Sequence, residues 1–358
     1  MMNIPQPILS ICIPTYNRAA CLDRLLYCFS RLNEPCSASV EICISDNQST
    51  DHTQQIISSW SQKISIKSVV QTVNLGASRN VQEVVKLASG RWILIVGDDD
   101  SLNLPGFERF MKVLEGLNEN LWILLPVGDK EGRELYLTGV SPSLRQGIYG
   151  SVEFENILMR IGLCRFGFIG MHVFPASCRH QLVSFSAIES RPWPHLALFL
   201  RHLNAYRVYI FSDIVVAQAF NGNELYWSPT DWASINFAKI RIIAGALRST
   251  GVRASFFRLL MLREFYSWGF SKTLILSRTL EPRRYRSFVR SDLLTYYHLL
   301  DALTPLLLCH FLGVLLLYLV PSRLLECIFS LAGKSSILDG YRERAHSLAG
   351  FNGFSRGV

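Results

Sequence analysis

The sequence predicts an α/β fold, in which a mostly parallel β-sheet is flanked by helices and followed by a helical C-terminal part. Through the first half, short apolar runs alternate with amphipathic stretches, a βαβα pattern typical of parallel sheets covered on both faces. The 358 residues are 49% hydrophobic and 18% charged, which suffices for a large core and excludes a disordered chain or a disulfide scaffold. Nine cysteines without a CxxC pair or zinc-like spacing indicate free thiols in a reducing compartment.

The first 125 residues contain the clearest alternation of strands and helices. Continuous apolar runs predict five strands: Ile8–Ile13, Val40–Ser45, Ile66–Val70, Trp92–Val96 and Leu121–Leu125. Apolar residues at helical spacing predict four helices between them: Ala19–Leu32, Thr53–Trp60, Ala77–Ala88 and Pro105–Leu117. The polar, glycine-rich stretch 129–150 predicts loops or a small side sheet.

After residue 150 the alternation resumes and then gives way to helices. We expect a helix, an apolar strand, a second helix and further strands, in this order: Val152–Gly162, Phe166–Phe174, His195–Leu203 and Arg207–Val216. From about Ser228 the pattern is nearly all helical: Trp232–Arg248, Ala254–Trp268, Tyr285–Leu303 and Leu306–Val320. The sequence thus predicts two domains, residues 1–227 and residues 228–358.

The net charge of +8 is concentrated in the C-terminal part. Residues 1–232 carry 19 basic and 21 acidic groups, whereas residues 233–358 carry 17 and 7. This asymmetry predicts that the two parts have different partners.

Four polar segments follow the predicted strands of the first half. Ligands of open parallel sheets bind beyond the carboxyl ends of the strands, so these segments are expected to share one edge. They are Pro14-Thr15-Tyr16-Asn17-Arg18, Ser45-Asp46-Asn47-Gln48-Ser49-Thr50-Asp51, Asn74-Leu75-Gly76-Ala77-Ser78-Arg79-Asn80 and Gly97-Asp98-Asp99-Asp100. Each could be an ordinary turn or helix cap. Three adjacent carboxylates after a buried strand, however, repel each other unless a cation neutralises them, and oxygen ligands suit Mg²⁺ or Mn²⁺ bridging to a diphosphate.

The order of these motifs resembles a known enzyme family. ICIPTYNR, ICISDNQSTD, NLGASRN and ILIVGDDDSL, over roughly residues 8–104, are similar to family 2 of the glycosyltransferases, inverting enzymes with a GT-A fold. Further on, RPWPH (191–195) and QAFNGN (218–223) resemble the abequosyltransferase-like branch, which acts in bacterial O-antigen assembly.

The resemblance implies a nucleotide-sugar site and a metal. In the first loop it implies a pocket for the base and ribose, formed by Pro14, Thr15, Tyr16 and Arg18. In the next two segments it implies that Asp46 and Asn47 lie beside the pyrimidine ring and that Arg79 lies near the base or phosphates.

Aligning GDDDSL with the family's DxD run puts Gly97 where the family has its first Asp. Asp98 is then expected to contact the ribose or the ion, and Asp99 to hold Mn²⁺ or Mg²⁺. Asp100 is expected to orient its neighbours and complete the metal cluster. Gly97 departs from the family pattern by removing one carboxylate.

The implied reaction is a single in-line displacement, in which a base deprotonates the acceptor hydroxyl. The family places this base as an Asp, often in a Glu-Asp pair, at a helix start that here reads Trp193-Pro194-His195-Leu196. His195 is therefore the first candidate base, because imidazole titrates near neutral pH, and Glu189 is the second. The alternative for His195 is a helix-start histidine that packs or caps. His172 is expected to be a core histidine.

The C-terminal part suggests contact with a membrane. Leu306–Val320 is strongly apolar, but Pro305 and Pro321 bracket only 15 residues, against the ~20 that a spanning helix needs, which favours a buried or interfacial helix. Upstream, arginines interleave with apolar residues, a pattern suited to anionic headgroups or to an ordinary basic helix face: Arg278, Leu280, Arg283, Arg284, Tyr285, Arg286, Phe288, Val289 and Arg290. No nucleic-acid recognition motif accompanies the charge, so nucleic acid is not an expected partner.

These features predict a sugar transferase at the inner face of a cytoplasmic membrane. We expect a peripheral or monotopic protein without a signal peptide, which transfers a hexosyl or deoxyhexosyl group from a nucleotide-diphosphate donor to a lipid-linked saccharide. Two alternatives stay open. A nucleotidyltransferase would need a glycine-rich phosphate loop near the first strand, and PTYNR has no glycine. An inactive family member acting as an assembly subunit would bind nucleotide without turnover.

Overall fold

A computed structural model of the chain describes residues 6–34, 36–129, 132–133, 145–185 and 193–218, and in the C-terminal part residues 254–265, 281–288 and some single positions. The chain divides into two compact units, Met1–Asn221 and Gly222–Val358. The sequence predicts this boundary slightly later, after residue 227.

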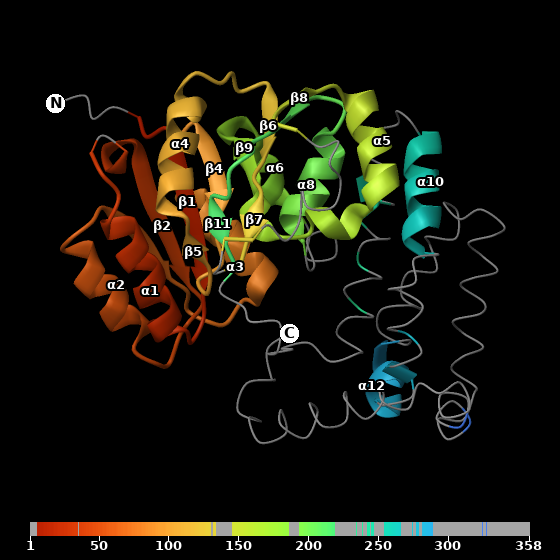
Figure 1. Cartoon of the computed structure of the whole chain (residues 1–358). Helices are drawn as coiled ribbons and strands as arrows, with labels where there is room; N and C mark the ends of the chain where they lie inside the picture. The colour runs from red at the N-terminus through yellow and green to blue at the C-terminus, as the bar shows by residue number, and fades with distance from the viewer. Residues whose placement is uncertain are drawn as a thin grey trace. The chain divides into compact units, whose positions relative to one another are not determined.

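The first unit is built on an eight-stranded sheet with the order β3-β2-β1-β4-β9-β6-β10-β8 (Figure 1). Parallel pairing joins β1 to β2 and β4, β2 to β3, and β6 to β10, while β9 and β8 run antiparallel to their neighbours. The predicted α/β fold with a mostly parallel sheet is therefore confirmed. The strands are β1 Leu9–Thr15, β2 Val40–Asp46, β3 Ile66–Val70, β4 Trp92–Ile95, β6 Leu121–Leu124, β8 Gly147–Tyr149, β9 His172–Pro175 and β10 Arg207–Ile210.

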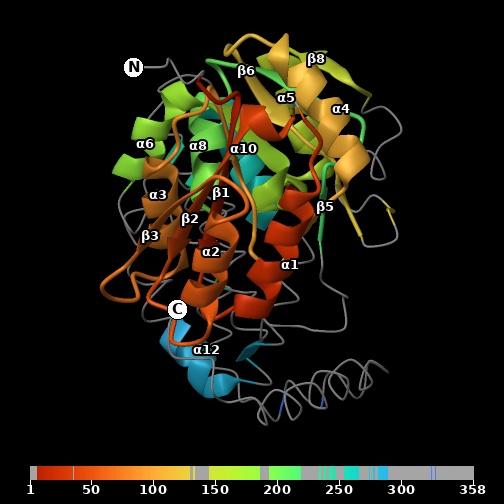
Figure 2. The ribbon, with the colours of Figure 1, turned by 90° about the vertical axis from the view of Figure 1, so that its left-hand side faces the viewer.

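Helices cover both faces of this sheet. In Figure 2, α3, α6 and α8 lie on one side of strands β1 and β2, and α1 and α4 lie on the other; α2 packs beside α1. The helices of this unit are α1 Ala19–Ser30, α2 Thr53–Ser61, α3 Ala77–Lys86, α4 Leu104–Glu115, α5 Ser151–Ile161, α6 Arg179–Ser184 and α8 Pro194–His202.

Burial on both faces explains why the strands are continuously apolar. In β1, Leu9, Ile11 and Ile13 are fully buried and belong to one hydrophobic cluster with residues of α1, α2 and α4. The alternating Cys12 points to the opposite face, where its Sγ lies 3.9 Å from the carbonyl oxygen of Val84 on α3. Because helices cover both faces, most residues of both faces are apolar, and two polar exceptions, Ser10 and Glu41, are hydrogen-bonded to each other.

An aromatic cluster packs around β6 and β9, and one strand predicted in this region is largely absent from the structure. Trp122 packs against Phe174 and Phe199 with ring centroids 5.4 and 5.2 Å apart. The predicted strand Phe166–Phe174 is wrong over most of its length, because the run first forms two 3₁₀ turns, Leu163–Phe166 and Ile169–Met171, and only then enters β9. Gly170 is needed there, since an added Cβ would lie 2.9 Å from the Phe168 ring. Burial in this cluster, rather than strand pairing, explains why the run is apolar.

The structure contains a second sheet of three strands, and the sequence does not predict the positions of these strands. Its order is β5-β11-β7, and its strands are only two residues long: β5 Ser101–Leu102, β7 Val127–Gly128 and β11 Val216–Ala217. The predicted strand region Arg207–Val216 therefore divides between two sheets. Segments this short have no periodicity that a sequence could display.

The second unit is described in part. Helix α10 spans Ala254–Phe265 and α12 spans Pro282–Phe288. The arginines at 283, 284 and 286 are exposed, whereas Tyr285 and Phe288 are buried, so these two aromatic residues are not available to insert into a bilayer. The predicted apolar helix 306–320 lies outside the described residues. Within the described part of the chain, no helix combines the length and apolarity needed to cross a membrane.

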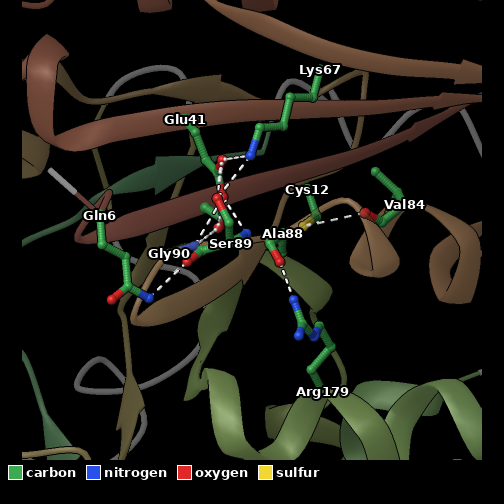
Figure 3. Close-up of polar contacts among 10 residues, drawn as sticks. Gln6, Cys12, Glu41, Lys67, Val84, Ala88, Ser89, Gly90 and Arg179 are labelled. Carbon is green, nitrogen blue, oxygen red and sulfur yellow. Dashed lines mark hydrogen bonds and ion pairs between the residues drawn. The ribbon is translucent and has the colours of Figure 1, made fainter. Parts of the chain in front are cut away.

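A buried carboxylate ties together the amino ends of the strands (Figure 3). Glu41 in β2 accepts hydrogen bonds from Ser10, Lys67 and Ser89 and from the Gly90 N–H at 2.9 Å. Burial by itself raises the pKa of Glu41, but the hydrogen bonds from Lys67, Ser10 and Ser89 outweigh it and lower the pKa to about 2. Glycine is required at position 90, because a Cβ there would lie 2.7 Å from Ser10 Oγ. This network anchors the turn between α3 and β4.

Replacing Glu41 by Gln is expected to destabilise the fold by about 3 kcal/mol at neutral pH. The unfolded-state pKa of a Glu is about 4.3 and the folded pKa of Glu41 is about 2, so its contribution is complete above about pH 4.3 and is lost as the pH falls towards 2. Urea unfolding at several pH values measures this. Glu83→Gln, which removes an ion-paired carboxylate on α3, is the control and should cost less than about 1 kcal/mol. Equal losses in both variants would contradict the assigned role of Glu41.

Candidate active site

Three strands deliver polar residues to one edge of the sheet. β1, β2 and β4 are parallel neighbours (Figure 1), and the register pairs Thr15 with Asp46 and Cys12 with Ile95. The loops that follow these strands therefore begin side by side, as the sequence predicts. The residues brought together include Thr15, Arg18, Asp98 and Asp99, which are in direct contact.

The loop after β1 is held by the loop after β2. Asn17 has a φ of 51°, in the left-handed region that Asn adopts more readily than most residues. Its backbone N–H donates to Ser49 Oγ at 2.8 Å, and its Oδ1 accepts from the Thr50 N–H at 2.7 Å. These bonds fix where Tyr16 and Arg18 project. Tyr16 is 39% exposed and offers an aromatic face at the mouth of the site.

A buried amide on α3 supports the same loops. Asn80 Nδ2 donates to the carbonyl oxygens of Thr15 and Ser45 at 3.3 and 3.0 Å, and Asn80 Oδ1 accepts from Ser45 Oγ at 2.6 Å. Sequence reasoning assigned no role to Asn80 or to Asn17. The available signal was an Asn inside a helix and another between a Tyr and an Arg, both sites where Asn is used for side-chain hydrogen bonds to the backbone.

Asp46 is a buried carboxylate with one oxygen unused. Its Oδ1 accepts from the Ser49 N–H at 2.9 Å, whereas its Oδ2 has no hydrogen-bond partner among the described residues. Neighbouring Asn47 is occupied, because its Oδ1 accepts from the Leu75 N–H at 2.8 Å and its Nδ2 donates to Asn74. A buried acceptor without a donor is costly, so Asp46 Oδ2 marks a place where a ligand N–H would be stabilised.

The three aspartates after β4 differ in exposure. Asp98 and Asp100 are buried, while the Asp99 side chain is 36% exposed. Burial, together with repulsion from Asp99, outweighs the attraction of Arg18 and raises the pKa of Asp98 to about 6. Burial and the neighbouring carboxylates raise the pKa of Asp100 well above its usual range. The loop thus concentrates negative charge that the protein only partly neutralises.

Two residues at the end of β1 and in the loop after it partly neutralise these aspartates. Thr15 Oγ1 donates to Asp98 Oδ2 at 2.7 Å. Arg18 Nη1 contacts Asp99 Oδ2 and lies 3.6 Å from Asp98 Oδ1. Both contacts join segments more than 80 positions apart in the chain. They place Arg18 on the carboxylates, whereas the resemblance implies a place in the base and ribose pocket.

The carboxylates after β4 are compatible with a divalent cation if Asp99 binds it together with substrate phosphates. Within the described ranges, no cluster of three or more His, Cys, Asp or Glu side chains forms a ready metal site. A Cβ added at Gly97 would lie 2.8 Å from Asp100 Oδ2, so a larger residue there would require the Asp100 side chain to shift. The exposed oxygens of Asp99 do suit Mg²⁺ or Mn²⁺, which often use one or two carboxylates together with substrate phosphates. Asp99 would be the main ligand in this mode.

Arg79 is positioned by its own helix. It forms an ion pair with Glu83 at 3.0 Å and donates to Gln82 Oε1 at 2.9 Å. Gln82 in turn donates to the carbonyl oxygens of Leu182 and Phe185 at 3.1 and 2.9 Å. This chain of contacts connects α3 with the C-terminal end of α6 and with Phe185, which follows it.

Of the two candidate bases, Glu189 and His195, the structure describes only His195. Glu189 lies outside the described residues. His195 begins α8 but is only 1% exposed, and its Nε2 donates to the Gly167 carbonyl at 3.1 Å. Burial, together with His172 at a ring distance of 5.0 Å, lowers the pKa of His195 well below its usual value. An acceptor hydroxyl cannot reach this ring without movement of the chain, so the geometry favours the packing alternative.

His172 is the satisfied core histidine that the sequence predicts. Trp122 Nε1 donates to its Nδ1 at 3.0 Å, and its Nε2 donates to the Phe166 carbonyl at 2.7 Å. Burial lowers the pKa of His172 to about 4. Both buried histidines therefore hold the turn at Phe166 and Gly167 in their neutral form.

Comparison with known proteins identifies the class. Residues 10–172 match the family described as "Glycosyl transferase family 2". Over these residues the chain therefore resembles the glycosyltransferases of family 2, as its motifs predict.

Particular relatives refine the match. A stretch of 97 residues is 41% identical to the abequosyltransferase RfbV of Salmonella typhimurium strain LT2 and covers 26% of this chain and 29% of that protein, which confirms the predicted likeness to that branch. A 208-residue stretch is 25% identical to a PGL/p-HBAD biosynthesis glycosyltransferase of Mycobacterium bovis strain BCG and covers 55% and 74% of the two chains. The chain thus matches less than a third of the length of RfbV.

Solved structures agree on the fold. A crystal structure of Staphylococcus aureus TarS 1-349 in complex with UDP-GlcNAc superposes with a TM-score of 0.60 at 18% identity, covering 97% of this chain and 93% of that chain. The predicted GT-A fold is confirmed by this likeness.

Acidification is expected to destabilise the protein through the buried histidines. The folded pKa of His172 is about 4 and the unfolded value is about 6.5, so between these values the unfolded chain binds more protons. The contribution of His172 is therefore complete above about pH 6.5 and is lost as the pH falls towards 4, by up to about 1.4 kcal/mol per pH unit. Urea unfolding at about pH 7 and pH 5 measures the slope.

His172→Gln should reduce that slope, because Gln can accept from Trp122 and donate to Phe166 without titrating. His52→Gln changes an exposed histidine and is the matched control. An unchanged slope in His172→Gln would contradict the assignment.

Proposed function

We propose that the first unit transfers a sugar from a nucleotide-diphosphate donor to a hydroxyl of a saccharide acceptor. The observation that carries this proposal is Asp46 Oδ2, a buried acceptor without a described partner at the same sheet edge as the exposed Asp99. A ring N–H of uracil or thymine, or the amino group of cytosine, would satisfy Asp46. The UDP-GlcNAc bound to TarS supports a nucleotide sugar as the donor.

In this proposal the chemistry is an inverting in-line displacement at the anomeric carbon. Asp46 orients the base, and Asn47, through its bonds to Asn74 and Leu75, holds the neighbouring loop in place. Tyr16 covers the base, and Asp98, held by Thr15, keeps Asp99 directed towards the diphosphate. When bound, Mg²⁺ or Mn²⁺ supplies charge neutralisation for the leaving diphosphate. Because His195 is buried, Glu189 becomes the first candidate for the base that deprotonates the acceptor hydroxyl.

The proposed acceptor is a lipid-linked saccharide in the assembly of a bacterial surface polysaccharide such as O-antigen, and the proposed transferred group is a hexose or deoxyhexose. Support comes from the activity in the name of the relative RfbV, an abequosyltransferase. It also comes from the exposed arginines of α12, which suit a membrane on which such an acceptor would be found.

A second candidate function is a nucleotide-binding assembly subunit without turnover. The burial of His195 favours it, since the first predicted base cannot meet an acceptor in this conformation. The two candidates share nucleotide binding and differ in turnover. A nucleotidyltransferase is disfavoured by the family 2 match and by the absence of glycine from the loop after β1.

Calorimetry with UDP, CDP, GDP and dTDP in the presence of Mn²⁺ tests the donor site. One nucleotide should bind, and Asp99→Asn should abolish the part of the affinity that depends on Mn²⁺, because the exposed carboxylate is lost. Asp213→Asn is the matched control, since Asp213 is 35% exposed and also paired with an arginine, Arg109. Equal affinity in Asp99→Asn and wild type would contradict the site. Hydrolysis or transfer of the matching nucleotide sugar then separates an enzyme from an inactive subunit.

We propose further that the second unit contacts anionic membranes through charge alone. Arg283, Arg284 and Arg286 are exposed on α12, whereas Tyr285 and Phe288 are buried and cannot anchor it. Attraction without insertion is weak and is screened by salt.

Co-sedimentation with vesicles of phosphatidylserine and phosphatidylcholine should therefore occur at low salt and disappear at high salt. Changing Arg283, Arg284 and Arg286 to Gln should reduce binding, by about 1 kcal/mol for each charge. The control changes three exposed cations of the first unit: Arg24, Arg31 and Lys63. Equal binding by the two triple variants would show that α12 is not the contact.

A further inference from the structure

Arg18 lies on the carboxylate that is best placed to hold a metal. Its Nη1 contacts Asp99 Oδ2 and lies 3.6 Å from Asp98 Oδ1. The backbone on either side is fixed, because Asn17 is bound to Ser49 and Thr50 and α1 begins at Ala19. The guanidinium is thus held over the aspartates by a well-anchored loop.

One carboxylate oxygen of each buried aspartate, Asp98 and Asp100, already accepts a hydrogen bond. Thr15 Oγ1 donates to Asp98 Oδ2 at 2.7 Å, and the Gly97 N–H donates to Asp100 Oδ2 at 3.2 Å. Asp98 and Asp100 are also buried, so a cation from solvent reaches Asp99 first. There it meets the guanidinium of Arg18.

Two cations cannot share this carboxylate without cost. A divalent ion and a guanidinium about 4 Å apart repel each other by several kcal/mol even at the effective dielectric constant of a protein surface. A metal ion on Asp99 therefore requires Arg18 to move away. A diphosphate offers the displaced guanidinium a favourable alternative, because Arg binds phosphate oxygens through two parallel hydrogen bonds.

We propose that Arg18 is the resident counter-cation of the aspartate cluster and competes with the divalent metal for Asp99. The free metal then binds weakly, and it binds well only together with the nucleotide diphosphate, whose phosphates accept Arg18 in exchange. In this exchange Asp99 always has a cation beside it, first Arg18 and then the metal, while Arg18 passes from a carboxylate to a phosphate. The proposal rests on the proposed donor site, and it assigns to Arg18 control over when the metal enters.

Titration with Mn²⁺ alone tests the competition without nucleotide or turnover. The free ion is followed by electron paramagnetic resonance, for wild type, Arg18→Met and Arg24→Met. Arg18→Met should bind Mn²⁺ at least about tenfold more tightly than wild type, because the competing charge is gone. Arg24 is an exposed cation on the same helix that contacts Cys21, and Arg24→Met should stay within about threefold of wild type.

A second substitution separates competition from a general change of charge or fold. Adding Asp99→Asn to Arg18→Met should remove the gain in Mn²⁺ affinity. Circular dichroism checks folding, and Arg18→Gln replaces Arg18→Met if the latter is unfolded. If wild type binds no Mn²⁺ and the variant does, the proposal is supported.

Equal affinities of wild type and the Arg18 variant, or no binding by either, would overturn the competition. If Arg18→Met still binds Mn²⁺ more tightly than wild type after Asp99→Asn is added, the competition is overturned as well. Because nucleotide is absent, a failure here leaves the proposed transferase function untouched. Conversely, an inactive protein could still show the competition.

Discussion

Three carboxylates in sequence at the end of a buried strand impose the main constraint on this fold. Their mutual repulsion has to be offset from elsewhere in the chain, and the loop after β1 supplies Thr15 and Arg18 for this purpose. To reach the cluster, that loop must bend sharply at Asn17 and be tied to the loop after β2. The loop after β1 is therefore placed both by its contacts with the aspartates and by its bonds to the loop after β2.

The two edges of the sheet use buried acids in opposite ways. At the amino edge, Glu41 is surrounded by donors, so the charged form is favoured and the pKa is lowered. At the carboxyl edge, Asp98 and Asp100 lie beside other carboxylates, so the charged form is disfavoured and their pKa values are raised. The first arrangement stabilises the fold, whereas the second stores electrostatic energy that a bound cation can release.

His195 shows that a histidine expected to act as a catalytic base can instead have a structural role. At a helix start a histidine is a reasonable base, although the unbroken apolar run Leu196–Leu200 that follows His195 is typical of a buried helix. Its burial results from the packing of α8 on the aromatic cluster, together with His172, Trp122 and Phe199. Since a buried imidazole is kept neutral by desolvation, it serves here as a donor to a backbone carbonyl.

Much of this protein could be predicted from local patterns. The alternation of apolar runs and amphipathic stretches determined the α/β class, and the loops after the strands identified the site edge, because both depend on neighbours in the sequence. The tertiary structure alone decided that Arg18 pairs with Asp99, that one Asp46 oxygen has no partner among the described residues, and that His195 is buried. The bond from Thr15 to Asp98 spans 83 positions. Such contacts depend on how strands order in space and on how much solvent the packing excludes, and neither quantity is encoded at any single position.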